Sequence, residues 1–144
     1  LVFRASAGIR TRGVGVTILL DTHVLLWWWS EPHHLSARLV ALLKDPANEV
    51  VVSAASAWEI ATKHRIGKYP AGARIIVEWH DRLARDGFRD LPIACAHALR
   101  AGSLPGPHRD PFDRMLAAQG IMEGLPVASN DRALSELGAE RVWE

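Results

Sequence analysis

The stretch TILLDTHVLLWWW, residues 17–29, determines our expectation for the fold. Its first four residues, Thr17 to Leu20, form a short apolar run typical of a buried β-strand, and Asp21 ends that run. The residues from His23 to Trp29 predict a helix directly after the strand. A strand that passes at once into a helix is typical of an α/β domain built around a mostly parallel sheet.

The same alternation continues along the chain. Val50 to Val52 predicts a second buried strand, and Ser53 to Ile66 predicts a helix that ends at Gly67. Further short runs predict strands at residues 88–91, 126–129 and 141–143. Apolar residues at helical spacing, with flanking Pro or Gly, predict helices at residues 35–43, 73–84, 92–100, 111–124 and 131–137. We therefore expect an α/β fold with a mostly parallel central sheet of four to five strands.

The composition fits one domain. A chain of 144 residues, 49% of them apolar, can bury a substantial core. The single cysteine, Cys95, excludes a disulfide framework and a cysteine-based zinc site, and it fits a reducing compartment, so we expect the cytoplasm. The longest apolar stretches, such as residues 24–29, are far shorter than the roughly 18 residues typical of a membrane span. We therefore do not expect a membrane protein.

Residues 1–16 differ from the rest of the chain. They contain Arg4, Arg10 and Arg12 but no acidic residue, and they show neither strand nor helix periodicity. We expect a disordered or artefactual N-terminal extension over these residues and a single domain over residues 17–144. Without the three arginines the formal net charge changes from +1 to −2, so the domain is not a generally basic nucleic-acid coat.

Acidic residues follow several of the predicted strands. Asp21 ends the first strand, Glu59 lies on the helix after the second, Asp110 and Asp113 open the helix after a Pro/Gly-rich loop, and Asp131 follows the fourth strand. Taken singly, each has an ordinary explanation as a helix cap, and the stretch from Ser56 to Glu59 matches a capping box. Taken together, they would meet at the carboxyl edge of one parallel sheet, where open α/β folds place their active sites.

Such a group of carboxylates has a specific chemistry. Crowded carboxylates either share protons or hold cations, and oxygen-only ligands select hard ions such as Mg²⁺ or Mn²⁺. A pair of these ions can activate water and stabilise the leaving oxygen of a phosphodiester. Zinc hydrolysis is disfavoured, because the sequence has no His-Glu-x-x-His motif and the pair His33 and His34 lacks ligand spacing.

Four blocks of the sequence resemble, in the same order, those of the PIN-domain nucleases, and most closely those of the VapC toxins of bacterial type II toxin–antitoxin pairs. The blocks are ILLDTH at 18–23, SAWEI at 56–60 running into KHRIGK at 63–68, HRDPFDR at 108–114, and SND at 129–131. The resemblance covers residues 17–143. It implies a three-layer α/β/α sandwich that hydrolyses RNA with Mg²⁺ or Mn²⁺, a VapB-like antitoxin that blocks the site, and a homodimer.

The resemblance also implies roles for individual residues. It places Asp21, Glu59, Asp113 and Asp131 in the catalytic, metal-binding cluster, with Asp21 and Asp113 as the central ligands. Asp110 would mainly cap its helix, with a supporting role left open, and Ser129 could orient a carboxylate or a metal-bound water. The cations near these blocks are candidate contacts for RNA phosphates, and they are Arg65, Arg109 and Arg114, together with Lys63, Lys68 and Arg132.

Two alternatives remain open at this stage. One is a catalytically silent PIN-like module that binds RNA or an antitoxin. The other is a receiver-type α/β protein, which would need paired acids near the first strand, where the sequence offers only Asp21. For the run Trp27 to Trp29, we expect one or two rings in the core and another at a subunit or antitoxin interface, because consecutive helical residues point to different faces.

Overall fold

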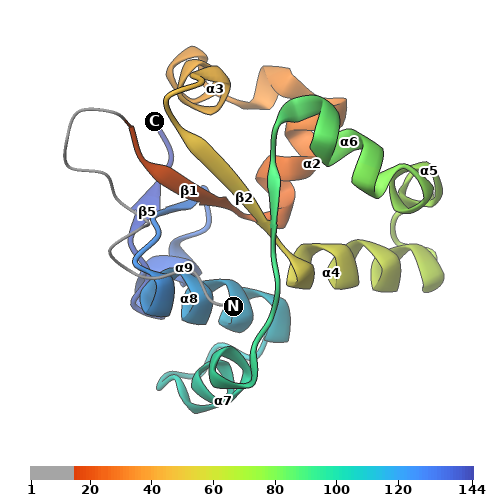
Figure 1. Ribbon diagram of the computed structural model, residues 1–144. Helices are drawn as coiled ribbons and strands as arrows, with labels where there is room; N and C mark the ends of the chain where they lie inside the picture. The colour runs from red at the N-terminus through yellow and green to blue at the C-terminus, as the bar shows by residue number, and fades with distance from the viewer. Residues whose placement is uncertain (1–14) are drawn as a thin grey trace.

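The computed structural model describes residues 15–144 and shows a five-stranded, all-parallel sheet with the strand order β3-β2-β1-β4-β5 (Figure 1). The strands are β1 Thr17–Leu20, β2 Glu49–Ser53, β3 Arg89–Leu91, β4 Val127–Ala128 and β5 Arg141–Val142. All five lie where the sequence predicts them. Residues 1–14, most of the expected extension, lie outside the described residues. Val16 lies within the described residues, and its N–H donates to Oδ1 of Asn48, the residue before β2, at 2.9 Å.

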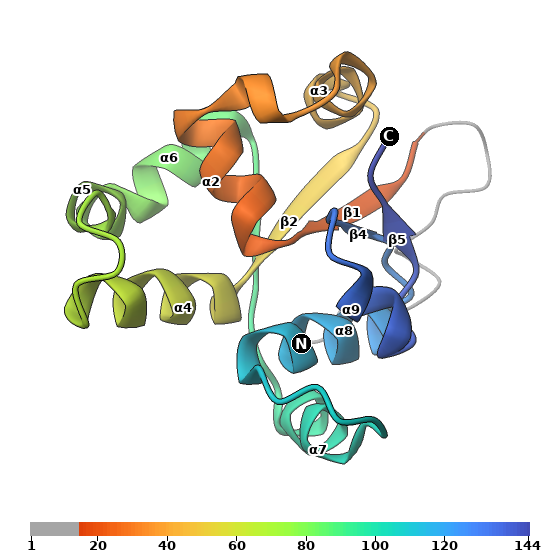
Figure 2. The same cartoon turned by 180° about the vertical axis from the view of Figure 1, so that it is seen from behind.

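Helices cover both faces of this sheet. They are α2 Thr22–Ser30, α3 Ala37–Lys44, α4 Ala54–Arg65, α5 Gly72–Val77, α6 Trp79–Asp86, α7 Cys95–Ser103, α8 Pro111–Glu123 and α9 Arg132–Glu136, with a short 3₁₀ turn, η1, at Pro32–His34. Figures 1 and 2 show α7, α8 and α9 on one face, and α2, α3 and α6 on the other. The expected three-layer α/β/α sandwich is confirmed.

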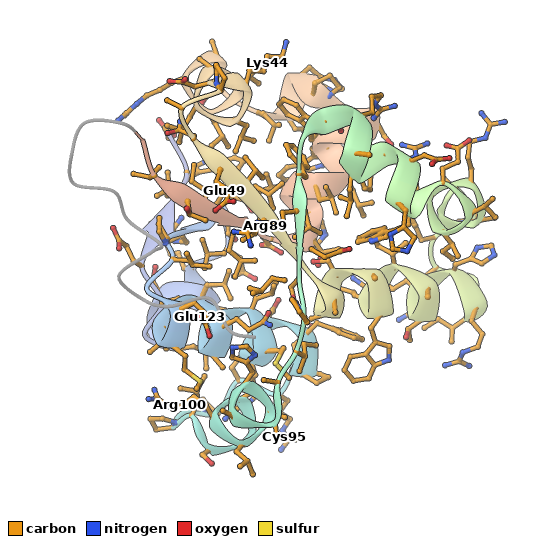
Figure 3. All side chains as sticks on the ribbon, viewed as in Figure 1. Lys44, Glu49, Arg89, Cys95, Arg100 and Glu123 are labelled. Atoms are coloured by element: carbon orange, nitrogen blue, oxygen red, sulfur yellow. The ribbon has the colours of Figure 1, made fainter. Side chains whose placement is uncertain are left out.

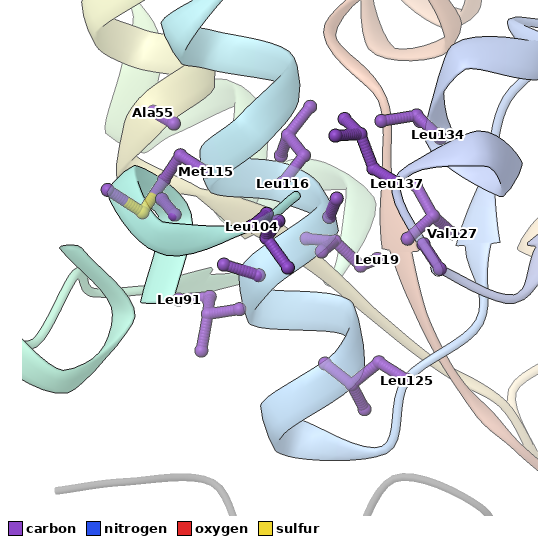
Figure 4. Packing of buried hydrophobic residues seen from close by; sticks show 14 of the residues in the cluster. Leu19, Ala55, Leu91, Leu104, Met115, Leu116, Leu125, Val127, Leu134 and Leu137 are labelled. Atoms are coloured by element: carbon purple, nitrogen blue, oxygen red, sulfur yellow. The ribbon is translucent and has the colours of Figure 1, made fainter. Parts of the chain in front are cut away.

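The central strands are buried on both faces. On β1, Leu19 packs among α7, α8 and α9, in the cluster shown in Figure 4, whereas Ile18 and Leu20 pack on the α2, α3 and α6 side. On β2, Val51 joins the first cluster, and its neighbours Val50 and Val52 join the second. This explains why the strands read as continuous apolar runs rather than alternating ones.

Two helix predictions need correction. The single helix expected over residues 73–84 is two helices, α5 and α6, with a break at Glu78. The side chains of Ile75 and Leu83 both enter the core. On one straight helix, two residues eight positions apart would point in directions about 80° apart, so the break lets both side chains reach the core. The helix expected from Pro92 begins instead at Cys95. Pro92 precedes it, and its carbonyl accepts a hydrogen bond from Gln119 Nε2 at 3.1 Å.

The three consecutive tryptophans all contact the core on one face of the sheet. Trp27, Trp28 and Trp29 are all half-buried against the same core cluster. Trp28 Nε1 and Trp29 Nε1 both donate to Asp86 Oδ2 on α6, at 3.1 and 2.7 Å. This carboxylate holds two neighbouring indoles, so α2 and α6 are fixed to each other.

Polar contacts also support the sheet. Arg89 and Glu49, both labelled in Figure 3, form an ion pair between β3 and β2 with a distance of 2.7 Å from Nη2 to Oε1. His97 Nε2 and Glu123 Oε2 lie 2.8 Å apart in the interior between α7 and α8, each side chain 3% exposed. Among residues 15–144, no helix is both long enough and apolar enough to cross a membrane.

Two helical glycines provide a test of the packing of α8 on the sheet. A Cβ at Gly120 would lie 2.9 Å from Val127 Cγ2 and 3.1 Å from the carbonyl oxygen of Leu125, whereas a Cβ at Gly102 on α7 would meet nothing within 4 Å. We expect Gly120→Ala to lower the free energy of unfolding by about 1–3 kcal/mol, despite the helix preference of alanine. Urea denaturation measures this change.

Gly102→Ala is the matched control. Here only helix propensity acts, so the free energy of unfolding should rise, by at most about 1 kcal/mol. A stabilised Gly120→Ala protein would contradict the close approach of α8 to β4.

Candidate active site

The acids singled out in the sequence follow the carboxyl ends of neighbouring parallel strands. Asp21 follows β1 directly, Glu59 lies in the second turn of α4 after β2, and Asp131 lies three residues beyond β4. Asp113 lies in the first turn of α8. The starts of α2, α4 and α8 lie together at one edge of the sheet in Figures 1 and 2. The fold therefore directs these carboxylates toward one region, as open α/β sheets do at their active sites.

Asp21 occupies the N-cap position of α2, but its side chain makes no capping hydrogen bond. Its carboxylate is 4% exposed, and its Oδ2 accepts a hydrogen bond from Ser129 Oγ at 2.6 Å. Burial raises the pKa of Asp21, and the negative charge of Glu59 adds to this effect, while the Ser129 hydroxyl opposes it. The carboxylate is thus buried beside β4, with the Ser129 hydroxyl as its side-chain hydrogen-bond partner.

Glu59 is not a capping residue either. The helix begins at Ala54, and its N-cap is Ser53, whose Oγ accepts from the Ala55 N–H at 2.9 Å, so the expected capping box is wrong. Glu59 is 4% exposed, and its Oε2 lies 2.6 Å from Lys63 Nζ one turn later. It is a buried carboxylate with one cationic partner.

Asp113 carries the clearest electrostatic signature of the group. Burial raises its pKa to about 6, and the negative charges of Asp110, Asp21 and Asp131 contribute. His108 opposes the shift, with its Nε2 2.9 Å from Asp113 Oδ2. The charges of these three acids therefore act on the Asp113 carboxylate.

Asp110 and Asp131 do cap helices, as the simpler explanation predicts. Asp110 Oδ1 accepts from the N–H groups of Phe112 and Asp113, at 2.9 and 3.2 Å. Asp131 is exposed, and its Oδ1 accepts from the Ala133 N–H at 2.9 Å. Capping therefore explains these two acids and leaves Asp21, Glu59 and Asp113 unexplained.

Ser129 connects two members of the group. The hydroxyl that donates to Asp21 also accepts from the Asp131 N–H at 2.9 Å, and the side chain is fully buried. One hydroxyl thus fixes the orientation of the Asp21 carboxylate and the start of the loop that carries Asp131.

The carboxylates are coupled electrostatically, but they are not tightly packed. In the part of the chain that the structure describes, one group of three or more candidate metal ligands has its ligand atoms within 4.8 Å of one another, and it is the exposed set Glu31, His33 and His34. No three of the carboxylates of Asp21, Glu59, Asp113 and Asp131, all among the described residues, lie within that distance of one another. Asp21 and Asp113 are oxygen donors with raised pKa values, and such donors fit a hard divalent cation, which would relieve the repulsion between them.

The neighbouring cations have different roles. Arg114 was expected to contact RNA, but its guanidinium donates to the carbonyl oxygens of Ala101, Leu104 and His108, so it holds the loop before α8. Arg65 and Arg109 are exposed, and neither forms an ion pair among residues 15–144. These two remain available to phosphates.

Two residues whose side chains contact the acids were not identified as such from the sequence. Lys63 was noted only as a candidate phosphate contact, although its i,i+4 spacing from Glu59 is the signal of an ion pair on a helix. His108 reaches Asp113 across a loop turn, and no spacing rule identifies such a contact.

Known proteins share the fold and much of the sequence of this chain. The PIN domain family matches residues 18–140. Ribonuclease VapC22 of Mycobacterium tuberculosis is 32% identical over 119 residues, which are 82% of this chain and 89% of that protein. Ribonuclease VapC16 of the same organism is 40% identical over 67 residues, 45% of this chain and 48% of that protein.

Solved structures agree on the fold. A structure of VapBC2 from Rickettsia felis, bound to a DNA fragment from its promoter, superposes with a TM-score of 0.67 and 14% identity. The superposition covers 90% of this chain and all of the matched chain. The family match extends over most of the sequence, and the first relative is similar over nearly its whole length. The chain therefore belongs to the PIN-domain family, among its VapC ribonucleases.

Proposed function

We propose that this VapC-family protein is a metal-dependent endoribonuclease and the toxin of a type II toxin–antitoxin pair. The main support for the proposal is the environment of Asp21. Its carboxylate is buried and makes no capping hydrogen bond, and the negative charge of a second buried carboxylate, Glu59, raises its pKa. Such an arrangement costs stability unless a cation is bound there, and so it favours a metal site over a structural role.

Each residue of the site has a defined task in this mechanism. Asp21 and Asp113 would be the central ligands of Mg²⁺ or Mn²⁺, and Glu59 and Asp131 would complete the set, directly or through water. Ser129 holds the Asp21 carboxylate in one orientation through its 2.6 Å hydrogen bond. When bound, the ion would activate water for in-line attack on a phosphodiester and stabilise the leaving oxygen. The products would carry a 5′-phosphate and a 3′-hydroxyl.

Substrate contact falls to the exposed cations near the site. Arg65 at the end of α4 and Arg109 before α8 are exposed. We propose that they bind phosphates that flank the cleavage site, since phosphate contacts position a nucleic acid without reading its sequence.

A partner protein is part of the proposal. The similar structure from Rickettsia felis is one of a VapBC complex. We propose that a VapB-like antitoxin blocks this site, and that the protein forms a homodimer. Large apolar side chains stand exposed on several helices, among them Trp58 at 54%, Leu99 at 73% and Val77 at 85%, and they offer surface for both contacts.

The first prediction concerns cleavage. We expect the wild-type protein to cut RNA with Mg²⁺ or Mn²⁺ but not with EDTA, and Asp21→Asn or Asp113→Asn to lower kcat/KM at least about 100-fold, because each removes a charged ligand. Asp110→Asn should cost much less, because asparagine still caps the helix. The assay uses purified transfer and ribosomal RNA.

Circular dichroism controls for the fold of each variant. Full activity of both the Asp21 and Asp113 variants would overturn the assignment of the ligands. Metal binding without cleavage of any RNA would favour the catalytically silent module instead.

The second prediction concerns stability without metal. The pKa of Asp113 is raised to about 6, so the folded state binds its proton more tightly than the unfolded state does. The resulting stabilisation is present below about pH 4 and is lost as the pH rises through about 6. At pH 7 with EDTA, Asp113→Asn should therefore have a higher Tm than the wild type, and it should be less sensitive to pH between 4 and 7.

Added Mg²⁺ should reverse this order, because it stabilises only the protein that binds it. Asp90→Asn, at a half-exposed position on β3, is the matched control and should change neither behaviour. A lower Tm for Asp113→Asn in EDTA would show that the carboxylate supports the fold.

The third prediction concerns partners. We expect the chain expressed with its cognate antitoxin to purify as a complex without RNase activity, and the chain expressed alone to elute as a dimer. Light scattering after size exclusion measures both masses. A monomer that retains full activity in the presence of the antitoxin would contradict the proposal.

A further inference from the structure

A cavity of about 260 Å³ lies beside the acidic site, between α2, α4 and the loop that leads to α5. The site residue Glu59 lines it, and so do aromatic, aliphatic and cationic side chains that the proposed mechanism does not use. Figure 2 shows the start of α2 near the start of α4, and α5 beyond the other end of α4.

We propose that this cavity binds the nucleobase next to the scissile phosphate and prefers a base with an exocyclic amino group over uracil. The inference rests on the proposed ribonuclease function and adds to it a site that selects the substrate.

The cavity is continuous with the acidic site. Thr22, which directly follows Asp21, and Glu59 both line it. The Thr22 and Ser56 hydroxyls lie 2.8 Å apart in the interior, so the start of α2 is fixed against α4 at this place. A base in the cavity would therefore have its own phosphate close to the carboxylates.

The walls suit a flat, partly apolar ring. Leu26 and Trp27 line the cavity from α2, Ile60 from α4, and Tyr69 from the following loop. The volume lies just below the roughly 300–1,000 Å³ typical of sites for drug-sized ligands, and so it fits a smaller group. Aromatic and apolar walls of this kind hold nucleobases in single-stranded RNA.

The charges on the cavity suit the rest of a nucleotide. Lys68 lines it, is exposed, and forms no ion pair within the described part of the chain. Lys63 also lines it and contacts Glu59. Because Lys63 is paired with Glu59, Lys68 is the ammonium group on the cavity that we expect to contact a phosphate of the ligand.

The cavity is preformed. The Tyr69 N–H donates to the Lys63 carbonyl at 3.2 Å, and a Cβ at Gly72 would lie only 3.0 Å from Tyr69 Cδ2. The tyrosine ring is thus held closely against the start of α5. On the other wall, Trp27 stacks on His34 with ring centroids 4.9 Å apart. Rigid aromatic walls reduce the entropy that binding would otherwise cost.

The preference for an amino group follows from Glu31. Its carboxylate is exposed, lines the cavity, and is an acceptor only. Adenine, cytosine and guanine each carry an exocyclic amino group that can donate to it, and uracil carries none. The Watson–Crick-edge donor of uracil, its N3–H, lies between two carbonyl oxygens that a carboxylate would repel, which disfavours uracil.

The test compares RNA oligonucleotides that differ by one base. The cleavage site is first mapped on a randomised RNA, and each flanking nucleotide is then replaced by an abasic one. At one flanking position, loss of the base should lower kcat/KM of the wild-type protein on the order of 10-fold. In Tyr69→Ala, and in Leu26→Trp, which fills the cavity, loss of the same base should cost less than about 2-fold. Lys44→Ala, at an exposed position on α3, should behave like the wild type.

The base preference is read from the same mapped sites. The wild-type protein should cut poorly where uracil occupies the selected position, and Glu31→Gln should reduce that discrimination, because the amide can donate to a carbonyl oxygen. Equal losses upon base removal in the wild type and in both cavity variants would overturn the proposal. Such a result would leave the cavity to a protein partner.

A binding measurement separates this proposal from the ribonuclease proposal. If the wild type cuts no RNA, calorimetric titration with cytidine 5′-monophosphate in EDTA still tests the cavity. Weaker binding by Tyr69→Ala and Leu26→Trp than by the wild type would support the site. Equal binding by all three proteins, or binding by none, would overturn it.

Discussion

The central position of β1 is the constraint on which the rest of the structure depends. This strand pairs with β2 on one side and β4 on the other, and its residues are fully buried. The chain must leave the sheet at Leu20, so the residue that follows stands at the carboxyl edge, between the ends of two other strands. Asp21 is that residue, and Ser129, beyond β4, lies close enough to donate to it. The acidic site thus follows from strand order, since a different neighbour for β1 would remove the partner of Asp21.

Negative charges collected in this way repel one another, and the molecule offsets the repulsion locally. Each of the three acids that is free of a capping role has its own partner: Lys63 for Glu59, Ser129 for Asp21 and His108 for Asp113. None of these contacts restores an ordinary pKa to Asp21 or Asp113. The partial compensation keeps the carboxylates in place while it leaves them disposed to bind a cation.

The sequence predicted what depends on local pattern and missed what depends on tertiary contacts. The five strands and the acids that follow them could be predicted, because apolar runs and strand ends are local signals. Residues Ser56 to Glu59 match a capping box, yet α4 begins two residues before Ser56 because Ser53 takes the N-cap position. Arg114 looked like a phosphate contact, but its guanidinium donates to three carbonyl groups of α7 and of the loop before α8. Neither the N-cap of α4 nor the partners of Arg114 can be predicted without knowing which residues the fold brings next to them.

Buried hydrogen bonds fix the distance between α4, which carries Glu59, and α8, which carries Asp113. Ser53 Oγ, at the start of α4, donates to Gln119 Oε1 of α8 at 2.5 Å, and Gln119 Nε2 donates in turn to the Pro92 carbonyl beyond β3. Both side chains are fully buried, so neither can exchange its partner for water. This link joins the helix that carries Glu59 to the helix that carries Asp113, a turn or more from each acid. Because α4 also contributes Ile60 and Lys63 to the adjacent cavity, the same link sets the position of the cavity relative to the carboxylates. The acidic residues and the adjacent cavity are therefore held at a fixed separation by hydrogen bonds that involve neither of them.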